Sequence, residues 1–484
     1  MNRQIRGLGV MLMVLFAALF VQVNYLQIFS ADRLNSHPAN TRAIVRDFAR
    51  PRGVIQTSDG VVLARSVEVD DEFERQREYP EGALFAHVTG YLSFAFGAEG
   101  IERTYNDELV GRDQETEITK LSDLLVKREL TGDVTLTISK KLQQVASEQL
   151  GERKGAVVAL NPRTGAVLAM ADYPSYDPNR LAGHSQSEVR AAWEELNADP
   201  DKPLLSRAFR ERYPPGSSFK VVTAASALAS GAASIANPVY PTLTALPLPN
   251  SGGQTLANFG GGSCGGNLPE ALRVSCNTAF AQLGMDMGAE KLAGGAGEFG
   301  FREEPPIDLP FAAASNFPEA GAFDRDLPGL AKSAIGQQDV SATPLQMALV
   351  AAAIANDGKI MKPHLLSEIR NDEGEVTETY RPEEWKQAVS SSVAQQVKDM
   401  MVGVVERGTG TAARLPGIQV AGKTGTAQTG LETNHVWFIS FAPANDPQIA
   451  VAVMLENLPT ASEATGGGLA APIARAVIQA ALAG

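Results

Sequence analysis

The chain begins with a long apolar run over residues 8–28, preceded by Arg3 and Arg6. The run approaches the ~20 residues that a helix needs to span a bilayer. Basic residues on its N-terminal side favour a cytoplasmic N-terminus with the rest of the chain exported. No cleavage site of the small-x-small kind follows promptly. An uncleaved signal anchor over residues 1–29 is therefore favoured over a removed signal peptide or a buried core helix.

From residue 30 to about residue 150 the pattern changes to short strand-like runs in a charged background. Residues 51–55 and 59–64 predict two short strands around a turn. Alternation over residues 134–138 predicts a further strand, and Ser139 is placed to cap the helical pattern that follows it. The region contains no candidate catalytic cluster. It is interpreted as a separate spacer or partner-binding module.

The remainder of the chain is richer in alanine, glycine and valine. Near-continuous apolar runs at residues 155–160 and 166–170 predict a hairpin in a sheet that is covered on both faces. Two further strong strand patterns lie at residues 436–441 and 449–455, and an alanine-rich pattern over residues 468–483 predicts a closing helix.

A connection rich in proline and glycine, residues 237–266, is too long for a simple loop and is predicted to carry its own hairpin or to lie over a site. The two cysteines are Cys264 and Cys276. In an exported protein they could form a disulfide that closes a short loop, and two buried free thiols are the alternative. Neither the cysteines nor the five histidines are spaced as metal ligands, so no metal site is predicted.

The length of 484 residues suggests two or three domains, and the hydrophobic content of 44% and charged content of 20% are ordinary for a globular protein. The formal net charge of −13 argues against general nucleic-acid binding, for which a basic face is expected.

Two prolines and a glycine immediately before Ser217 end the preceding structure, and a run of helix formers begins at Ser218. Ser217 is therefore predicted at a helix N-terminus, with Lys220 one turn away on the same face. An amine within reach of a hydroxyl is the geometry of an activated serine nucleophile. The helix N-terminus also favours the negative charge that develops when a serine attacks a carbonyl. Taken alone, this common pattern indicates only a helix cap and a solvated lysine.

Two more polar clusters interrupt apolar surroundings: Ser275 with Asn277, and residues 423–426, which read Lys-Thr-Gly-Thr. The order Ser-x-x-Lys, Ser-x-Asn, Lys-Thr-Gly resembles that of the penicillin-binding proteins and serine β-lactamases. Any one of these triplets is common, whereas all three in this order are specific.

The wider chain narrows the resemblance to the class B penicillin-binding proteins. The residues that carry it, apart from the three clusters, are Arg52-Gly53, Asp59-Gly60, Gly100-Ile101-Glu102, Asp133, Asn161-Pro162, Gly165, Gly336-Gln337, Thr343-Pro344-Leu345-Gln346, His435-Val436-Trp437-Phe438 and Ala471-Pro472. The short length and the cysteine pair are most similar to the actinobacterial division-associated type. One departure is Gln338, which stands where the family often has a glycine.

The resemblance implies an α+β fold with three parts. Residues 151–484 would form a transpeptidase domain of the penicillin-binding and serine β-lactamase kind, with an antiparallel five-stranded sheet flanked by helices and Ser217 opening a buried central helix. Residues 30–150 would form a smaller, mostly β, membrane-proximal module. Residues 1–29 would hold a transmembrane helix, which makes the chain a single-pass membrane protein with an extracytoplasmic catalytic domain.

The implied activity is that of a serine D,D-transpeptidase of cell wall synthesis, and no cofactor is implied. Such an enzyme would cross-link peptide stems through an acyl-enzyme on Ser217, with release of a terminal D-alanine. β-Lactams would acylate the same serine. Lys220 would be the base, with a pKa lowered by burial and by Lys423. Ser275 would relay a proton to the leaving amine, and Asn277 would hold Lys220 and a substrate backbone group.

The third cluster would bind the substrate from an edge strand. Lys423, Thr424 and Thr426 would attract and hold its terminal carboxylate, and Gly425 would leave room for a substrate strand to lie close. The backbone N–H groups of Ser217 and Thr426 would form the oxyanion hole.

The implied partners are D-Ala-D-Ala donor stems, amine acceptor stems, β-lactams, a SEDS-type glycan polymerase and other membrane proteins of division or elongation. A D,D-carboxypeptidase or a β-lactamase would share the three clusters, but the anchor and the N-terminal module disfavour both. A scaffold for a lipid-linked glycan polymerase remains a separate alternative. An unrelated Ser-Lys peptidase would not need residues 423–425.

Overall fold

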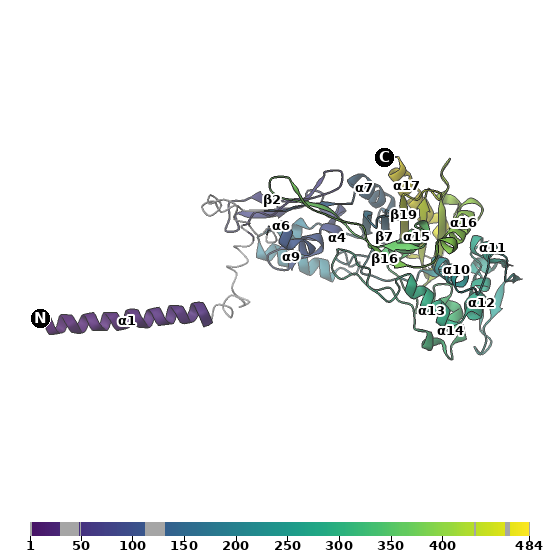
Figure 1. Cartoon of the computed structure of the whole chain (residues 1–484), viewed down its shortest axis with the longest axis horizontal. Coiled ribbons are helices and arrows are strands. Elements are labelled where there is room, and N and C mark those ends of the chain that lie inside the picture. The colour runs from purple at the N-terminus through teal and green to yellow at the C-terminus, as the bar shows by residue number, and fades with distance from the viewer. Residues whose placement is uncertain are drawn as a thin grey trace. The chain divides into compact units, whose positions relative to one another are not determined.

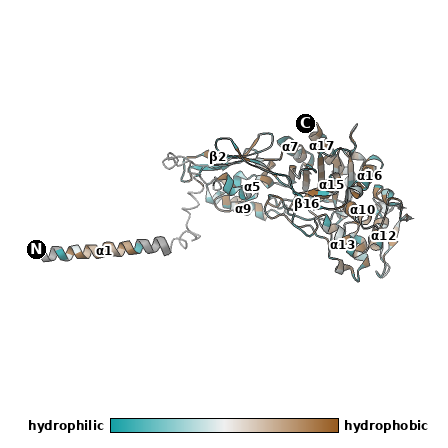
Figure 2. Ribbon diagram, in the orientation of Figure 1, coloured by the Kyte–Doolittle hydropathy of each residue, from teal (hydrophilic) through white to brown (hydrophobic). Residues whose placement is uncertain are grey.

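The chain divides into two compact units. The structure, a computed structural model, describes residues 2–29, 48, 50–111, 131–429, 432–459 and 465–483. One unit comprises Met1–Pro51 with Ser66–Gln76 and contains helix α1 (Asn2–Phe29). Beyond its first turn α1 is mainly hydrophobic in the part coloured in Figure 2. The sequence predicts a membrane-crossing helix over residues 8–28, whereas no helix in the described ranges is both long enough and apolar enough to cross a bilayer.

The other unit comprises Arg52–Arg65 with Arg77–Gly484. Most residues of a six-stranded sheet of order β15-β14-β6-β1-β2-β3 belong to this unit (Figure 1). Strand β1 pairs parallel with β6 and antiparallel with β2, and β14 pairs antiparallel with β6. The bounds are β1 (Ile55–Gln56), β2 (Val62–Glu68), β3 (Arg75–Glu78), β6 (Asp133–Leu136), β14 (Leu366–Arg370) and β15 (Val376–Thr379). A hairpin from late in the chain thus completes a sheet that begins near its start.

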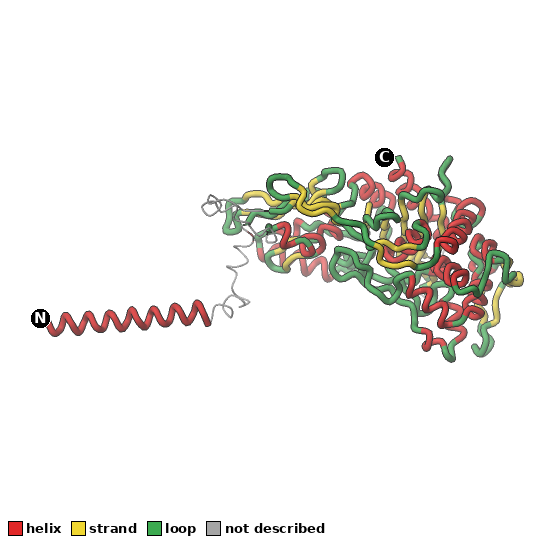
Figure 3. The backbone as a smooth tube through the Cα atoms, viewed as in Figure 1, coloured by secondary structure: helices red, strands yellow, loops and turns green. Residues whose placement is uncertain are grey.

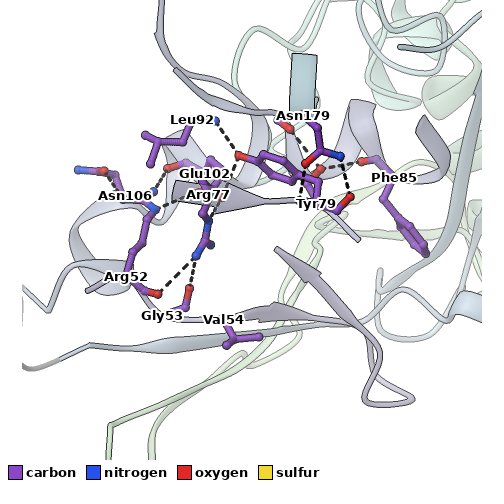
Figure 4. A network of polar contacts seen from close by, with 12 residues as sticks. Arg52, Gly53, Val54, Arg77, Tyr79, Phe85, Leu92, Glu102, Asn106 and Asn179 are labelled. Atoms are coloured by element: carbon purple, nitrogen blue, oxygen red, sulfur yellow. Dashed lines mark hydrogen bonds and ion pairs between the residues drawn. The ribbon is translucent and has the colours of Figure 1, made fainter. Parts of the chain in front are cut away.

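Between β3 and β6 the described chain forms short elements. They are η1 (Gly82–Leu84), α4 (Ala86–Thr89), β4 (Leu92–Ser93), β5 (Gly97–Ala98), α5 (Gly100–Thr104) and α6 (Asn106–Leu109). A buried polar network holds several of them (Figure 4). The carboxylate of Glu102 accepts hydrogen bonds from Arg52 at 2.7 Å and from Arg77 at 2.6 Å, and all three side chains are buried. Arg77 also donates to the carbonyl of Gly53 at 2.8 Å.

Helix α7 (Lys140–Leu150) lies where the sequence predicts it, but a different residue caps it. The side chain of Ser139 makes no capping hydrogen bond. Instead, the carboxylate of Asp59 accepts from the backbone N–H of Lys140 at 3.0 Å and of Lys141 at 3.5 Å. The prediction of a Ser139 cap is wrong because an acidic side chain from the turn between β1 and β2 reaches the same N–H groups.

A five-stranded antiparallel sheet forms the centre of the larger part of this unit (Figures 1 and 3), as predicted. Its order is β17-β18-β19-β7-β8, which leaves β17 at an edge. The bounds are β7 (Gly155–Leu160), β8 (Val167–Tyr173), β17 (Ala421–Gln428), β18 (Thr433–Ala442) and β19 (Ile449–Pro459).

Both faces of this sheet are covered. Alternate residues of a strand enter different hydrophobic cores, so that Val158 lies in one core and Val157 in the other. Helix α15 (Pro344–Ala355) packs on β19 and β7 in the first core. Helices α7 and α17 (Ala471–Leu482) pack together in the second core. Burial on both faces explains why the strands are apolar without alternation.

Most of the remaining helices lie on the side of the sheet that holds α15. On this side α10 (Lys220–Ala229) is buried and contacts α11, α12, α13 and α16. The helices and helical turns are α8 (Asn179–Ala182), α9 (Gln186–Ala198), η3 (Gly216–Phe219), α11 (Leu268–Arg273), α12 (Asn277–Met287), α13 (Ala289–Glu298), η5 (Ala320–Phe323), α14 (Leu327–Ser333), α16 (Ser391–Arg407), η6 (Thr411–Ala413) and η7 (Gly466–Ala470). Small strand pairs are β13 (Lys359–Met361) with β16 (Glu384–Gln387), β9 (Tyr240–Leu243) with β12 (Cys264–Gly266), and β10 (Ala245–Pro247) with β11 (Thr255–Ala257). The last two pairs confirm that the long connection carries its own hairpin. The helical turn η4 (Phe259–Gly261) lies in the chain between β11 and β12.

Candidate active site

Ser217 lies on a tight turn rather than on the helix that the sequence predicts from residue 218. Residues Gly216–Phe219 form a 3₁₀ turn, and α10 begins at Lys220. The backbone around this turn is held from two sides. Trp437 of β18 donates its indole N–H to the carbonyl of Pro214 at 3.0 Å, and the N–H of Gly216 donates to the carbonyl of Gly336 at 2.9 Å. Ser217 is therefore presented by a fixed turn.

Gly216 lets this turn approach the edge strand β17. Its φ is +52°, and a Cβ at this position would lie 2.7 Å from the carbonyl oxygen of Thr426. Only glycine tolerates both the positive φ and this close backbone contact. The contact brings the backbone beside Ser217 against the Lys-Thr-Gly-Thr segment of β17.

The amine of Lys220 is buried and makes three polar contacts with the second cluster. It donates to Oδ1 of Asn277 at 2.7 Å and to the carbonyl of Ser275 at 2.8 Å, and it lies 3.4 Å from Oγ of Ser275. Its Nζ also lies 5.5 Å from the centre of the Phe280 ring. The first two clusters of the sequence thus meet at a single amine.

Lys423 joins the third cluster to the same hydroxyl. Its buried amine donates to Oγ of Ser275 at 2.9 Å and to the carbonyl of Thr424 at 2.9 Å. Oγ of Ser275 therefore lies between two lysine amines. Ser275 has a φ of +60° and stands between α11 and α12, where a helix cap would be the simplest role for a serine. The cap position of α12 is instead Cys276, whose side chain makes no capping hydrogen bond.

Burial changes the protonation of both lysines. Burial, and after it the positive charge of Lys423, lower the pKa of Lys220 well below its usual value. Burial alone lowers the pKa of Lys423 to about 7. Within the described chain, neither amine donates a hydrogen bond to a carboxylate. A neutral amine beside a serine is what a general base at neutral pH requires.

A disulfide joins Cys264 of β12 to Cys276, with a Cα–Cα distance of 5.7 Å. Two hydrogen bonds reinforce this connection between the hairpin segment and the start of α12. Asn277 donates through Nδ2 to the carbonyl of Ala257 at 3.0 Å, and the side chain of Asn258 accepts from the N–H of Thr278 at 3.0 Å. Sequence reasoning did not single out Asn258, because an asparagine in a Gly-rich connection is most often a turn residue.

These residues surround a cleft of about 790 Å³. Its lining includes Ser217, Ser275, Asn277, Thr424 and Thr426 from the predicted site. The two lysines of the site lie behind this lining, fully buried.

The cleft is also lined by residues that the sequence did not reveal, among them Thr409 and Lys332. The hydroxyls of Thr409 and Thr424 lie 2.7 Å apart. The only sequence signal for Thr409 is its place between two glycines, which is too common to be specific. No group of three or more His, Cys, Asp or Glu side chains in the described ranges is arranged to hold a metal ion.

Models of two protein families match the chain. The penicillin binding protein transpeptidase domain matches residues 155–479, and the penicillin binding protein A dimerisation domain matches residues 52–134. The chain is 42% identical to the peptidoglycan D,D-transpeptidase PbpA of Mycolicibacterium smegmatis, over 100% of this chain and 99% of that protein.

Two solved structures have folds similar to that of this chain. Penicillin-binding protein A from Mycobacterium tuberculosis, in a ceftriaxone acyl-enzyme complex, is 40% identical with a TM-score of 0.83 and covers 90% of this chain and 100% of that chain. PBP2 of Pseudomonas aeruginosa, in complex with WCK 5153, is 30% identical with a TM-score of 0.73 and covers 89% of this chain and 95% of that chain.

Proposed function

The chain belongs to the class B penicillin-binding proteins and is a peptidoglycan D,D-transpeptidase acylated by β-lactams, and from this premise we propose that Ser217 is its nucleophile and Lys220 the base. The observation that carries the proposal is the buried amine of Lys220, which Ser275 and Asn277 hold beside the turn that presents Ser217 to the cleft. Its lowered pKa allows this amine to accept a proton at neutral pH.

The first half-reaction forms an acyl-enzyme. Oγ of Ser217 attacks the carbonyl carbon of the penultimate D-alanine while its proton passes to the neutral amine of Lys220. The C–N bond to the terminal D-alanine then breaks, and the leaving nitrogen takes a proton from Lys220 through the hydroxyl of Ser275. The position of that hydroxyl, 3.4 Å from Lys220 and 2.9 Å from Lys423, supports its role as the relay.

The oxyanion that forms during attack requires donors that point into the cleft. The backbone N–H groups of Ser217 and Thr426 are proposed for this role, and the close backbone approach of the turn to β17 supports it. Loss of one such donor typically lowers the rate by ~100-fold or more. Thr424 and Thr426 would hold the terminal carboxylate, with Lys423 supplying positive potential behind them.

In the second half-reaction an amine of a neighbouring stem attacks the ester of Ser217. The amine loses one proton, the ester C–O bond breaks, and Oγ of Ser217 recovers a proton through Lys220. The cross-link forms and the free enzyme returns. A β-lactam stops the cycle at the acyl-enzyme, because its ring-opened product stays attached to the serine.

A fluorescent penicillin tests the nucleophile in the detergent-solubilised full chain. We expect a long-lived covalent label in the wild type and in Ser218→Ala, because Ser218 only donates to the carbonyl of Pro215 at 2.7 Å. Ser217→Ala should lose the label. A folded Ser217→Ala variant that still labels would reject the assignment, and a label that clears within seconds would indicate a β-lactamase.

We also propose that residues 8–28 anchor the chain in the cytoplasmic membrane, with the catalytic domain outside. The arginines before the apolar run and the exposed apolar side chains of α1 support this proposal. Deletion of residues 8–28 should release the protein from the membrane fraction. A deleted chain that still sediments with the membrane would contradict the anchor.

The N-terminal module is proposed to bind a glycan polymerase of the SEDS type and other membrane proteins of division or elongation. A match of residues 52–134 to a dimerisation domain supports a protein-binding role for this module. Copurification of a polymerase with the full chain, lost when surface residues of this module are substituted, would test it. A polymerase that copurifies equally with both forms would argue against the module as its binding site.

A further inference from the structure

The cleft contains one charged side chain that the proposed mechanism does not use. Among the described residues that line the cleft, Lys332 alone is ionisable. Its side chain is half-buried, and its amine has no ion pair or hydrogen bond with any described residue. A cation that faces a substrate cleft without a protein partner is free to bind an anionic group of the substrate.

The backbone around Lys332 is fixed to the nucleophile's turn. The carbonyl of Lys332 accepts from the N–H groups of Ile335 at 3.2 Å and Gln337 at 3.1 Å. Gly336, in the same segment, accepts a hydrogen bond from the N–H of Gly216, the residue directly before Ser217. Lys332 is therefore carried by a supported segment and not by a loose loop.

A simpler role for this lysine would be to stabilise the C-terminal end of α14, where basic side chains interact with free carbonyls. Such a role would place its amine on a carbonyl of the last turn. No hydrogen bond of this kind is formed in the described chain, and the carbonyls of Leu330, Lys332 and Ser333 accept from backbone N–H groups of the following residues. The side chain lines the cleft.

Lys332 and the site proposed for the terminal carboxylate come from different elements of the cleft. That site is on the edge strand β17, whereas Lys332 comes from α14. No acidic side chain is among the described residues of the lining, so a substrate carboxylate would meet no opposing negative charge there.

Building on the proposed function, we propose that the amine of Lys332 binds a second carboxylate of a peptide stem, distinct from the terminal one. Lys332 would then be a specificity-determining residue for stems that carry an acidic group near the reacting residues. The carboxylate could belong to the donor stem that acylates Ser217 or to the acceptor stem that brings the amine. The shared chemistry is a charge-assisted hydrogen bond between an ammonium and a carboxylate.

Paired peptides test the proposal on the detergent-solubilised full chain. The donor probes are peptides ending in D-Ala-D-Ala that carry either a Glu or a Gln at one of the two preceding positions. Release of D-alanine without an acceptor gives kcat/KM for the donor arm. The acceptor arm uses one fixed donor and short amine-bearing peptides that differ in the same way, and the cross-linked product is measured.

We expect a preference for the acidic peptide of roughly tenfold in one arm, the range that a charge-assisted hydrogen bond gives. The preference should disappear in Lys332→Gln and persist in Lys332→Arg. Lys359→Gln, which removes an exposed lysine paired with Glu384, is the matched control for net charge and should keep the preference. The arm that shows the effect identifies the stem that provides the carboxylate.

An equal preference in the wild type and in Lys332→Gln would overturn the proposal, as would the absence of any preference in both arms of the wild type. Labelling by fluorescent penicillin is measured in every variant. A wild type that labels but shows no preference refutes the role of Lys332 alone, whereas a folded wild type without label refutes the proposed nucleophile.

Discussion

At the scale of single residues, the site depends on one hydroxyl that is shared by two buried amines. Oγ of Ser275 contacts Lys220 and Lys423, and these lysines come from segments far apart in the chain. Removal of either amine therefore changes the electrostatic surroundings of the other. The two lysines are not equivalent, because only Lys220 is also held by Asn277.

The first prediction concerns the pH dependence of acylation. Lys220 must be neutral to act as a base, so the acid limb of the rate profile follows its pKa. The charge of Lys423 helps to lower that pKa. Lys423→Met should therefore raise the pKa of Lys220 and move the acid limb to higher pH.

The measurement is the second-order rate of penicillin labelling as a function of pH. Lys423→Arg keeps the charge and should leave the limb near its wild-type position. An acid limb at the same pH in wild type and Lys423→Met would show that Lys423 does not influence the base.

The residues proposed to react could be found in the sequence because their types and order are specific, but the residues that support them could not. Ser217, Lys220 and Ser275 are recognisable as a pattern. Asn258 and Thr409 act through contacts with Thr278 and Thr424, which depend on the folded positions of distant segments. The sequence around such residues does not distinguish them, because asparagine and threonine are common in loops.

At the scale of elements, the disulfide and two hydrogen bonds hold one wall of the cleft to the start of α12. Residues 255–264 supply much of this wall, and Cys276 lies between Ser275 and Asn277. The connection was predicted to carry its own hairpin or to lie over a site. Its role as a wall follows from the cross-link, which the sequence left open as one of two states of the cysteines.

The second prediction is that reduction of the disulfide slows acylation without unfolding the domain. Without the cross-link, the wall and the Ser275–Asn277 pair are joined only by hydrogen bonds. Mild thiol treatment should lower the labelling rate, and the stability lost should be ~2–4 kcal/mol. Labelling rate and melting temperature are measured together.

A variant with Cys264→Ser and Cys276→Ser is the control, since its labelling rate should be low and insensitive to thiol. An unchanged labelling rate in the fully reduced wild type would show that the disulfide does not position the site.

The third prediction concerns the cap of α7. Asp59→Ala removes the acceptor for two backbone N–H groups and should destabilise the protein by ~1 kcal/mol. Ser139→Ala removes only the exposed hydrogen bond of 3.2 Å that the Ser139 hydroxyl donates to Asp59, so it should lower the stability by less. Thermal unfolding of the two variants compares these effects. A larger loss in Ser139→Ala than in Asp59→Ala would restore the serine as the cap.

At the scale of the whole molecule, the sheet and its two cores follow from patterns that the sequence shows plainly. The strands of the central sheet are apolar because both faces are buried, and that pattern identifies them without any knowledge of their order. The six-stranded sheet was harder to foresee. Its strands β14 and β15 lie more than two hundred residues from β6, so nothing local indicates that they pair.

The fourth prediction concerns the buried network of the N-terminal module. Burial alone would raise the pKa of Glu102, but the charges and hydrogen bonds of Arg77 and Arg52 hold it below its usual value. Glu102→Gln leaves two buried guanidinium groups without a counter-charge and should cost ~3–5 kcal/mol at neutral pH.

Because the folded pKa of Glu102 is depressed, the stability it contributes is present above the ordinary carboxyl pKa of ~4.3 and is lost as pH falls through the folded value. The difference in melting temperature between wild type and Glu102→Gln should therefore shrink in acid. Arg65→Ala, which breaks the exposed pair with Glu78, should change stability by ~1 kcal/mol or less. A Glu102→Gln variant as stable as Arg65→Ala would contradict this account.

The late hairpin of β14 and β15 limits how this protein can be divided. A fragment that starts at residue 155 would keep every residue of the cleft, yet β14 would lose β6, the strand it pairs with on one side. Conversely, a fragment that ends at residue 134 would contain β1 and β2 but would lack β14 and β15. The boundary between the two regions matched by family models is therefore not a place to cut, and neither half is a self-sufficient building block for expression or for domain exchange.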